Sequence, residues 1–304
     1  MLLAAGRGER MEPLSSVVPK PALEILGSPL LASALGNLRR AGCAEIVVNL
    51  HRHPEQVAAA ARAASRGNVR FSREIDLLGG AGGVAAARAL LGDGDVLVAN
   101  ADTWGELDLG AMAAARDDTA AILGLLPHPD PGRWSSVVLE ADGRVREILP
   151  PGMSRDEERF MFTGFQLLGR DVVAALPVPP CEMATVWSGL RREGRLRGVV
   201  VKGPWREAGT PSSYHTLVIE LLGDSAWVHP EARVARGARI ERSAIGAGCR
   251  VAAGAAITGC VVTAGASVEG RSTLTDCVLA GPVLVSGETI AGTLVVPTRR
   301  VPLR

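Results

Sequence analysis

Two basic side chains lie in a glycine-containing segment, residues 3–21, and their spacing suits the binding of phosphate groups. Gly6 and Gly8 would let the backbone approach a ligand closely, with its amide groups facing anionic oxygens. Arg10 offers a planar fork of donors to phosphate oxygens, and Lys20 offers a compact point charge. The third glycine of a dinucleotide fingerprint and the Gly-Lys-Ser/Thr of a P-loop are both missing, so the sequence predicts a phosphate site of another kind.

The residues around this segment indicate alternating strands and helices over the first 224 positions. Short apolar runs predict buried strands, and apolar positions at helical spacing predict helices. The predicted strands are 45–49, 68–72 and 95–99, and the predicted helices are 30–41, 57–64 and 83–91. This order predicts an α/β fold with a mostly parallel sheet that helices cover on both faces. Ligands of such sheets bind at the carboxyl ends of strands, where three loops begin: Gly6 onward, Asn100-Ala-Asp102, and Glu207 to Pro211.

From Trp227 the helical period disappears, and apolar residues recur at gaps of 6, 6 and 5, so that the pattern returns every 17 residues. The apolar row is Val228, Val234, Ile240, Ile245, Val251, Ile257, Val262, Val268, Leu274, Leu279 and Val285. Small residues, expected to point inward, follow at Ala232, Ala238, Ala244, Cys249, Ala255 and Val261. A period of six predicts a three-sided parallel β-helix, here of about four coils. Cys260 and Cys277 lie one period apart and are expected to stack on adjacent coils.

Residues 3–21 resemble the signature of the sugar-phosphate nucleotidyltransferases, the nucleotide-sugar pyrophosphorylase family. They read Leu3-Ala-Ala-Gly-Arg-Gly-Glu-Arg-Met-Glu-Pro-Leu-Ser-Ser-Val-Val-Pro-Lys-Pro21 and meet every fixed position of that pattern. Further likenesses follow in the family's order: Leu78-Gly-Gly-Ala-Gly82, Asn100-Ala-Asp-Thr-Trp104, Phe162-Thr-Gly-Phe165 and Trp205-Arg-Glu-Ala-Gly-Thr-Pro211. The C-terminal repeats resemble those of the mannose-1-phosphate guanylyltransferase branch. The likeness implies a Rossmann-like nucleotidyltransferase domain at 1–224 and a left-handed β-helix at 225–304.

The resemblance implies transfer of a nucleotidyl group from a nucleoside triphosphate to a sugar 1-phosphate, with release of pyrophosphate. Arg10 would contact the leaving pyrophosphate and Lys20 the phosphates near the reacting centre, as the catalytic residues. Asp102 and Glu207 would hold the cofactor Mg²⁺, which prefers carboxylates and substrate phosphates as ligands. The implied nucleotide-binding residues are Leu3, Ala4, Ala5, Gly6, Gly8, Gly79, Gly82 and Asn100, and the implied sugar-binding residues are Thr163 and Gly164.

The sequence departs from the family's pattern at places that bear on the substrates. Glu207 stands where the family has aspartate. The family's Glu-Lys-Pro is replaced by Arg146-Glu-Ile-Leu-Pro150, so Arg155 or Lys202 is expected to serve as the cation for the sugar phosphate. Residues 74–82 lack the glutamine that uridylyl- and thymidylyltransferases often use, and this favours GTP with mannose 1-phosphate.

Other functions stay open at this point. One is a uridylyltransferase, or another nucleotidyltransferase, that acts on a different hexose 1-phosphate. A catalytically silent regulatory subunit that senses nucleotide sugars would be expected to have lost Arg10, Lys20 or Asp102, and all three are present. An acyltransferase centre in the β-helix would need a base between coils, for which His229 is the candidate.

The composition of the 304 residues limits the partners and the compartment. A net charge of +1 gives no global field for a nucleic acid or a membrane surface. Five cysteines without CxxC pairs suit reduced thiols in the cytosol. Residues 1–5 are too short for a signal-peptide core, and no apolar run is long enough to span a bilayer. We therefore expect a cytoplasmic protein, without nucleic acid or membrane partners, that forms a homo-oligomer through the β-helix.

Overall fold

The computed structural model describes residues 1–303 except for 66, 117–119, 154–156 and 178–179. The chain divides into two compact units. The first unit comprises Met1–Arg7 and Leu31–Trp205, and the second unit comprises Gly8–Leu30 and Arg206–Arg304. The division therefore cuts the glycine-containing segment and joins its larger part to the C-terminal residues. The predicted domain limits, 1–224 and 225–304, stay a prediction.

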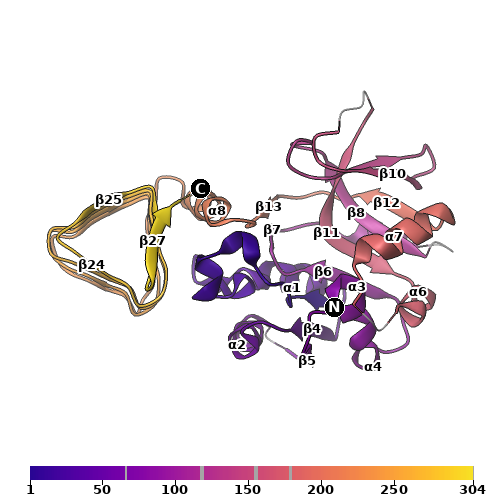
Figure 1. Cartoon of the computed structure of the whole chain (residues 1–304), viewed down its shortest axis with the longest axis horizontal. Coiled ribbons are helices and arrows are strands. Elements are labelled where there is room, and N and C mark those ends of the chain that lie inside the picture. The colour runs from indigo at the N-terminus through magenta and orange to yellow at the C-terminus, as the bar shows by residue number, and fades with distance from the viewer. Residues whose placement is uncertain (66, 117–119, 154–156, 178–179, 304) are drawn as a thin grey trace. The chain divides into compact units, whose positions relative to one another are not determined.

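A mixed sheet forms the centre of the first unit (Figure 1), with its strands in the order β10-β9-β11-β6-β1-β4-β5 and with β8 between β11 and β12. Strands β6, β1, β4 and β5 are parallel, as predicted for the early part of the chain. Strand β11 is antiparallel to both β6 and β8, so the later strands make the sheet mixed. The strands are β1 (Leu2–Leu3), β4 (Ile46–Leu50), β5 (Val69–Arg73), β6 (Val96–Asn100), β8 (Ala121–Pro127), β9 (Ser136–Leu139), β10 (Val145–Leu149), β11 (Phe160–Leu168) and β12 (Leu196–Val200).

Helices cover both faces of this sheet and enclose two hydrophobic cores. Leu35 of α1 and Met112 of α5 belong to one core, and Val84 of α3 belongs to the other. The uninterrupted apolar run of β4 follows from this arrangement, because Val47 faces one core and Val48 faces the other. The helices are α1 (Leu31–Arg40), α2 (Pro54–Ser65), α3 (Gly79–Ala86), α4 (Arg88–Leu91), α5 (Gly110–Ala114), α6 (Arg170–Ala175) and α7 (Met183–Arg192).

The prediction of one helix at 83–91 is wrong, because α3 already begins at Gly79 and a separate short helix, α4, follows it. Glycines are poor helix formers, so local preference does not favour this early start. A distant segment supplies the stabilisation: the carbonyl of Cys181 accepts the N–H groups of Ala81 and Gly82, each at 3.0 Å. A contact of this range is invisible to the helical period of the sequence.

The opening segment of the second unit, Gly8–Leu30, consists of short 3-10 turns followed by a two-stranded hairpin. Gly8 adopts a left-handed φ of 68°, and the hydroxyl of Ser15 donates to its carbonyl at 2.9 Å. Met11 and Leu14 are fully buried, which anchors the turns on either side of this bond. The elements are η1 (Glu9–Met11), η2 (Leu14–Ser16), η3 (Lys20–Ala22), β2 (Glu24–Ile25) and β3 (Ser28–Pro29).

Helix α8 (Pro211–Leu222) follows strand β13 (Trp205–Glu207) and packs against the outer face of the C-terminal strands. Its start is a capping box in which Thr210 and Ser213 exchange hydrogen bonds, with proline at the first helical position. Tyr214, one turn into the helix, is fully buried and donates its hydroxyl to the carbonyl of Glu24 at 2.7 Å. Helix α8 thereby fastens the opening segment within the second unit.

Residues from Trp227 onward form a parallel β-helix whose coils superpose as a triangle in Figure 1, consistent with the left-handed β-helix that the repeats predict. Ile245 pairs with Val262 and Val262 with Leu279, which confirms the period of 17 residues. The next partner of Leu279 is Val295, so the last coil is shorter, and antiparallel β27 ends this ladder. The strands are β14 (Trp227–Val228), β15 (Arg233–Val234), β16 (Arg239–Glu241), β17 (Ala244–Ile245), β18 (Arg250–Val251), β19 (Ala256–Thr258), β20 (Val261–Val262), β21 (Ser267–Glu269), β22 (Thr273–Thr275), β23 (Val278–Leu279), β24 (Leu284–Ser286), β25 (Thr289–Ala291), β26 (Thr293–Val296) and β27 (Arg299–Pro302).

The small residues that point inward differ from the prediction at one of the three corners. Ala255 lies in the core as expected, but Ala244 and Val261 lie in the strands on which α8 packs. Cys260 and Cys277 take the inward place at this corner, because its shorter gap moves the small position back by one residue. The N–H of Cys277 donates to the Sγ of Cys260 at 3.3 Å, so the two stack on adjacent coils as predicted.

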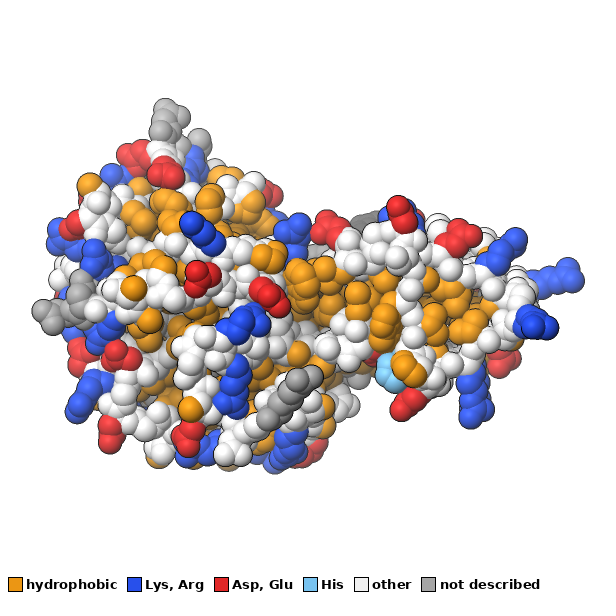
Figure 2. Space-filling view, turned by 180° about the vertical axis from the view of Figure 1, so that it is seen from behind, with side chains coloured by type: hydrophobic (Ala, Val, Ile, Leu, Met, Phe, Trp, Pro, Cys, Tyr) orange, Lys and Arg blue, Asp and Glu red, His pale blue; other side chains and the backbone are white. Residues whose placement is uncertain are grey.

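The surface carries charges of both signs. Over the broader part of the face drawn in Figure 2, basic and acidic side chains are interspersed. Pairs such as Arg116 with Asp95, at 2.6 Å, and Arg206 with Glu220, at 3.1 Å, neutralise many of them locally. Among the residues that the structure describes, no helix has the length and apolar character to cross a membrane.

Candidate active site

The first unit gathers several predicted residues at the carboxyl ends of two adjacent strands, β1 and β6. Leu3 of β1 stands opposite Asn100 of β6, and the N–H of Ala101 donates to the Leu3 carbonyl at 3.1 Å. Asp102 is partly exposed in the turn between β6 and β7 (Thr103–Gly105). Exposed Gly6 follows β1 after the buried pair Ala4 and Ala5. The predicted nucleotide-binding start of the chain and the predicted metal ligand of this unit therefore share one sheet edge.

Strand β11 brings the predicted sugar-binding residues to the same edge. Its pairing with β8 is interrupted between Phe162 and Gln166, as in a β-bulge, a feature frequent beside active sites. Gly164 has a left-handed φ of 89°, and a Cβ on it would lie 3.2 Å from the Cβ of Asn100. Thr163 is fully buried, and its hydroxyl donates to the carbonyl of Gly124 at 2.7 Å. Gly164 thus contacts a nucleotide-binding candidate, whereas the hydroxyl of Thr163 is engaged within the protein.

The predicted base-proximal glycines lie at the start of α3. Gly79 has a left-handed φ of 73°, and a Cβ on it would lie 2.7 Å from the carbonyl oxygen of Cys181. Gly82 is buried, and its amide donates to the same carbonyl. The absence of a side chain at Gly79 allows close packing against Cys181, and the contact of Gly79 and Gly82 with a nucleobase stays a prediction.

Two buried polar residues that the sequence reasoning missed connect these parts. The N–H of Ala4 donates to Asn49 Oδ1 at 2.7 Å, and Asn49 Nδ2 donates to Glu74 Oε1 at 2.7 Å. Glu74 Oε2 in turn accepts the N–H of Leu78 at 3.1 Å. The available signal was an asparagine near the carboxyl end of an otherwise apolar buried strand, β4.

The second unit holds the predicted catalytic residues and the other predicted metal ligand. Arg10 lies in η1, two residues after Gly8, and its Nη2 is 3.1 Å from Glu207 Oε1. The side chain of Arg10 is 68% exposed and that of Glu207 is 10% exposed, so the cation reaches toward solvent from a well-seated carboxylate. Lys20 is half-buried at the start of η3. The structure therefore brings Arg10 and Glu207 together within one unit.

The extra methylene of Glu207 is accommodated by Gly209. A Cβ on Gly209 would lie 2.9 Å from Glu207 Oε1 and 3.2 Å from Oε2, so the carboxylate is folded back into space that only glycine leaves. Glu207, like Asp102 in the first unit, offers carboxylate oxygens, which are ligands that Mg²⁺ prefers alongside substrate phosphates; that either residue holds the metal stays a prediction. Within the described ranges, no group of three or more His, Cys, Asp or Glu side chains is arranged to hold a metal ion.

Lys202 and Arg155 are the cations predicted for the sugar phosphate, and His229 is the candidate base in the β-helix. Lys202 is exposed after β12, and its carbonyl accepts the N–H of Asp108 at 2.8 Å. Arg155, the other cation named for the sugar phosphate, lies outside the described residues. His229 is at the first corner of the β-helix, where its Nδ1 accepts the N–H of Glu231 at 3.1 Å.

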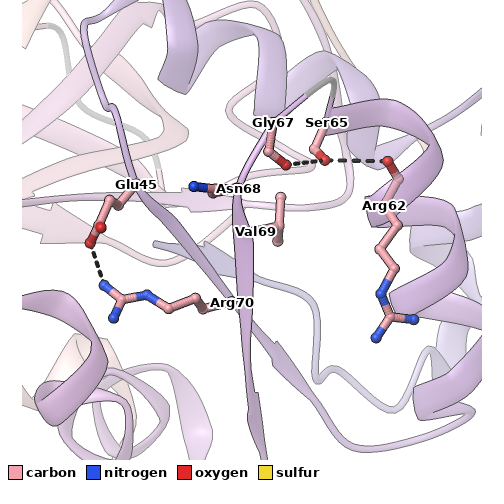
Figure 3. Close-up of a pocket in the computed structure, with 7 residues that line it drawn as sticks. All are labelled: Glu45, Arg62, Ser65, Gly67, Asn68, Val69 and Arg70. Carbon is pink, nitrogen blue, oxygen red and sulfur yellow. Dashed lines mark hydrogen bonds and ion pairs between the residues drawn. The ribbon is translucent and has the colours of Figure 1, made fainter.

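A surface pocket of about 360 Å³ lies apart from these residues, between the end of α2 and the start of β5 (Figure 3). Arg70 crosses it to pair with Glu45 and also donates to the carbonyl of Leu90 at 2.6 Å. The hydroxyl of Ser65 donates to the carbonyl of Gly67 at 3.0 Å. The side chains of Glu45, Ser65 and Arg70 are thus engaged within the protein, and none of the predicted site residues lines this pocket.

Comparison with known proteins finds relatives for most of the sequence. The profile of the family described as nucleotidyl transferase matches residues 1–221. An N-acetylmuramate alpha-1-phosphate uridylyltransferase of Caulobacter vibrioides is 33% identical over 235 residues, which cover 70% of this chain and 92% of that protein. Mannose-1-phosphate guanylyltransferase 1 of Arabidopsis thaliana is 26% identical over 267 residues, which cover 82% of this chain and 73% of that protein.

A solved structure supports the fold. The crystal structure of HddC from Yersinia pseudotuberculosis superposes with a TM-score of 0.64 and covers 72% of this chain and 97% of its own. At 22% sequence identity, this likeness concerns the fold alone.

Proposed function

The chain belongs to the nucleotidyl transferase family and is an enzyme that acts on a sugar 1-phosphate. We propose that its substrates are GTP and mannose 1-phosphate. The proposal rests on how much of the chain the match to the guanylyltransferase covers. It covers 82% of the chain, which is more than the part matched by the family profile, residues 1–221 of 304. The absence of the glutamine expected of uridylyltransferases in residues 74–82 supports the same choice.

In the proposed reaction, a phosphate oxygen of mannose 1-phosphate attacks the α-phosphorus of GTP. A bond forms between that oxygen and the phosphorus, the bond to the β-phosphate bridge breaks, and pyrophosphate leaves with both electrons. The protein contributes chiefly by positioning the two phosphates and by neutralising their charge. Arg10 would hold the departing pyrophosphate, and Lys20 would hold the phosphates at the reacting centre.

The carboxylates of Asp102 and Glu207 would hold Mg²⁺, which when bound neutralises charge on the phosphate oxygens. Because Glu207 already pairs with Arg10 at 3.1 Å, the pair sets one carboxylate and one guanidinium side by side before the nucleotide binds. Nucleotide phosphates would then draw Arg10 away from Glu207, since a phosphate offers the guanidinium more charge than a single carboxylate does.

A second candidate, UTP with N-acetylmuramate 1-phosphate, rests on a specific observation. The sequence identity to the uridylyltransferase is higher than that to the guanylyltransferase, at 33% against 26%. The match also covers 92% of the uridylyltransferase. That likeness is confined to 70% of the chain. We rank it second because it leaves most of the β-helix unaccounted for.

The test is an assay of pyrophosphate release by the purified chain with Mg²⁺, crossing GTP, UTP, ATP and dTTP with mannose, glucose and N-acetylmuramate 1-phosphates. We expect the highest kcat/KM for GTP with mannose 1-phosphate. The highest value for UTP with N-acetylmuramate 1-phosphate would replace the first proposal by the second. No release with any pair would contradict both.

The Asp102→Asn variant serves as the internal check on this assay. Loss of one carboxylate ligand should weaken the hold on Mg²⁺, leave the charge of the reacting phosphates less well neutralised and lower kcat by roughly 10²–10³-fold. The matched control is Asp93→Asn, because Asp93 is exposed and outside the proposed site, and it should leave kcat unchanged. Equal activity of the two variants would remove Asp102 from the mechanism.

We also propose a homo-oligomer that assembles through the β-helix, in the cytoplasm. A long stack of short strands offers flat outer faces suited to self-association. Light scattering of the full chain should give a mass above the 31.6 kDa of one chain. A mass equal to that of one chain at assay concentration would contradict this proposal.

A further inference from the structure

We propose that Asn49 and Glu74 form a buried relay that positions the two nucleotide-side loops against each other, the one at Ala4 and the one at Leu78. The inference rests on the proposed function, because it gives these loops a role in holding the nucleotide. Asn49 is 3% exposed and Glu74 is 4% exposed, so neither side chain can act by direct contact with bulk solvent or a surface partner. Their role must lie in what they hold.

The relay is a chain of three hydrogen bonds with one permitted direction. The backbone N–H of Ala4 can only donate, so Asn49 must turn its Oδ1 toward it, at 2.7 Å. Asn49 then has only its Nδ2 left for Glu74 Oε1, at 2.7 Å, and Glu74 accepts at both oxygens because Leu78 N–H donates to Oε2 at 3.1 Å. An ionised carboxylate, which accepts at both oxygens, satisfies this pattern.

The backbone places the two side chains where the loops begin. Asn49 lies near the carboxyl end of β4, beside β1, and the N–H of Glu74 continues the strand order by donating to the carbonyl of Leu50 at 2.8 Å. Helix α3 packs directly on the pair at Gly83. A Cβ there would lie 2.7 Å from Glu74 Oε1 and 2.8 Å from Asn49 Nδ2, so the helix that follows the Leu78 loop is seated on the relay.

Glu74 differs from a carboxylate that serves stability alone, because all its side-chain partners belong to the proposed site or lead to it. One oxygen leads through Asn49 to Ala4, which is in the glycine-containing segment. The other holds Leu78, which begins the base-proximal residues. Breaking the relay should let one loop shift relative to the other, and a displacement of about 1 Å at such a site can cost on the order of 10²-fold in rate.

The direction of the bonds permits a test by exchange of the two groups. In Glu74→Gln alone, the NH₂ group of the new amide must face either Nδ2 of Asn49 or the N–H of Leu78. One donor then meets another donor. In Asn49→Asp alone, two carboxylates meet at one short contact. In the double variant N49D/E74Q, the new carboxylate at position 49 accepts from Ala4 and from the new amide at position 74, and the oxygen of that amide accepts from Leu78. All three bonds are then restored with the same total charge.

The readouts separate positioning from folding and from the identity of the sugar. Each single variant should lower kcat/KM for the nucleotide by roughly 10–100-fold, with the KM of the sugar 1-phosphate unchanged, and N49D/E74Q should recover most of the loss. Hydrogen exchange at the amides of Ala4 and Leu78 in the free protein should be faster in the singles and slow again in the double. Glu55→Gln, an exposed change in α2, is the control and should alter neither readout.

Three results would overturn the relay. The first is singles that fold and keep the wild-type kcat/KM and exchange rates. The second is a double variant no better than the sum of its singles. If a single variant does not fold, N49D/E74Q should restore folding, and its failure to do so would be the third. If the wild-type chain shows no nucleotidyl transfer with any sugar, the proposed function fails, but the exchange rates still decide whether the relay exists.

Discussion

Glu207 and Arg10 show how single residues position one another in the second unit. A glutamate is one methylene longer than the aspartate of the family's pattern, and the structure absorbs the difference by folding the carboxylate back over Gly209. The same carboxylate then pairs with Arg10 at 3.1 Å. Glu207, which departs from the family's pattern, therefore fits into the local structure because Gly209 has no side chain.

This accommodation predicts the effect of Gly209→Ala. The φ of Gly209 lies outside the left-handed region, so alanine causes no backbone strain there. Its Cβ would instead clash with the carboxylate, at 2.9 Å from Glu207 Oε1. The displaced carboxylate should lower kcat/KM by about 10²-fold with little change in unfolding free energy. Gly94→Ala is the matched control, because nothing lies within 4 Å of its Cβ. Equal kinetics in both variants would show that the position of Glu207 does not matter.

At this scale the sequence predicts residue types better than residue partners. The glycine-containing segment predicts catalytic roles for Arg10 and Lys20 from local chemistry and spacing, and these roles stay predictions. The connection of Asn49 with Glu74 could not be predicted, since its hydrogen bonds join three segments that only the folded sheet brings together. Thr163 was predicted as a sugar contact, and this stays a prediction. Its hydroxyl donates a hydrogen bond to the carbonyl of Gly124, a partner that the sequence did not indicate.

At the scale of elements, α8 links the opening segment to the β-helix inside the second unit. Its residue Tyr214 is fully buried and donates to the carbonyl of Glu24 at 2.7 Å. Burial, with a smaller contribution from the charge of Glu24, raises the pKa of Tyr214 far above its usual range. The phenol of the folded unit therefore stays neutral, and remains a donor, at pH values where a free tyrosine ionises.

This pKa shift predicts how stability depends on alkaline pH. In the unfolded chain Tyr214 ionises near pH 10, whereas burial holds its pKa in the folded chain well above that value. Its contribution is thus fully present below about pH 10 and is lost as the pH rises further. Because the chain has one tyrosine, phenolate absorbance reports this group alone. Phenolate should appear only together with unfolding, and a midpoint near pH 10 in folded protein would contradict the burial.

Strands and helices were predictable where their pattern is local. The run 45–49 predicts β4 to within one residue, because both faces of that strand are buried and its apolar residues are contiguous. The helix at 83–91 was wrong because the carbonyl of Cys181, far along the chain, supports an earlier start. The antiparallel strand β11 also lay beyond the alternating pattern from which a mostly parallel sheet was predicted.

At the scale of the molecule, the opening segment Gly8–Leu30 belongs to the same compact unit as the β-helix. Two close approaches show this: a Cβ on Gly281 would lie 2.5 Å from Val17 Cγ1, and a Cβ on Gly27 would lie 2.9 Å from Trp227. The period of 17 residues predicted the coils, but nothing in it indicated that the coils support the segment that carries Arg10. That association depends on the tertiary packing of residues 200 or more positions apart.

The association predicts that a change in the β-helix affects catalysis. Gly281→Ala places a methyl group against Val17 and should lower kcat/KM by shifting the segment that carries Arg10 and Lys20. Gly287→Ala is the matched control, because Gly287 has a similar left-handed φ, 67° against 75°, with nothing within 4 Å. Both variants should lose about 1–2 kcal/mol of unfolding free energy through backbone strain. If their kcat/KM values are equal, the coils do not influence the segment.

Nucleotidyl transfer requires attack at the α-phosphorus, and the fate of the nucleotide's phosphorus atoms distinguishes it from attack at another phosphate. The purified chain would be given Mg²⁺, mannose 1-phosphate and GTP radiolabelled at either the α- or the γ-phosphorus, and the products would be separated. We expect the α label in a nucleotide sugar and the γ label in pyrophosphate. Recovery of the γ label as inorganic phosphate or on the sugar, with no α label in a nucleotide sugar, would contradict nucleotidyl transfer.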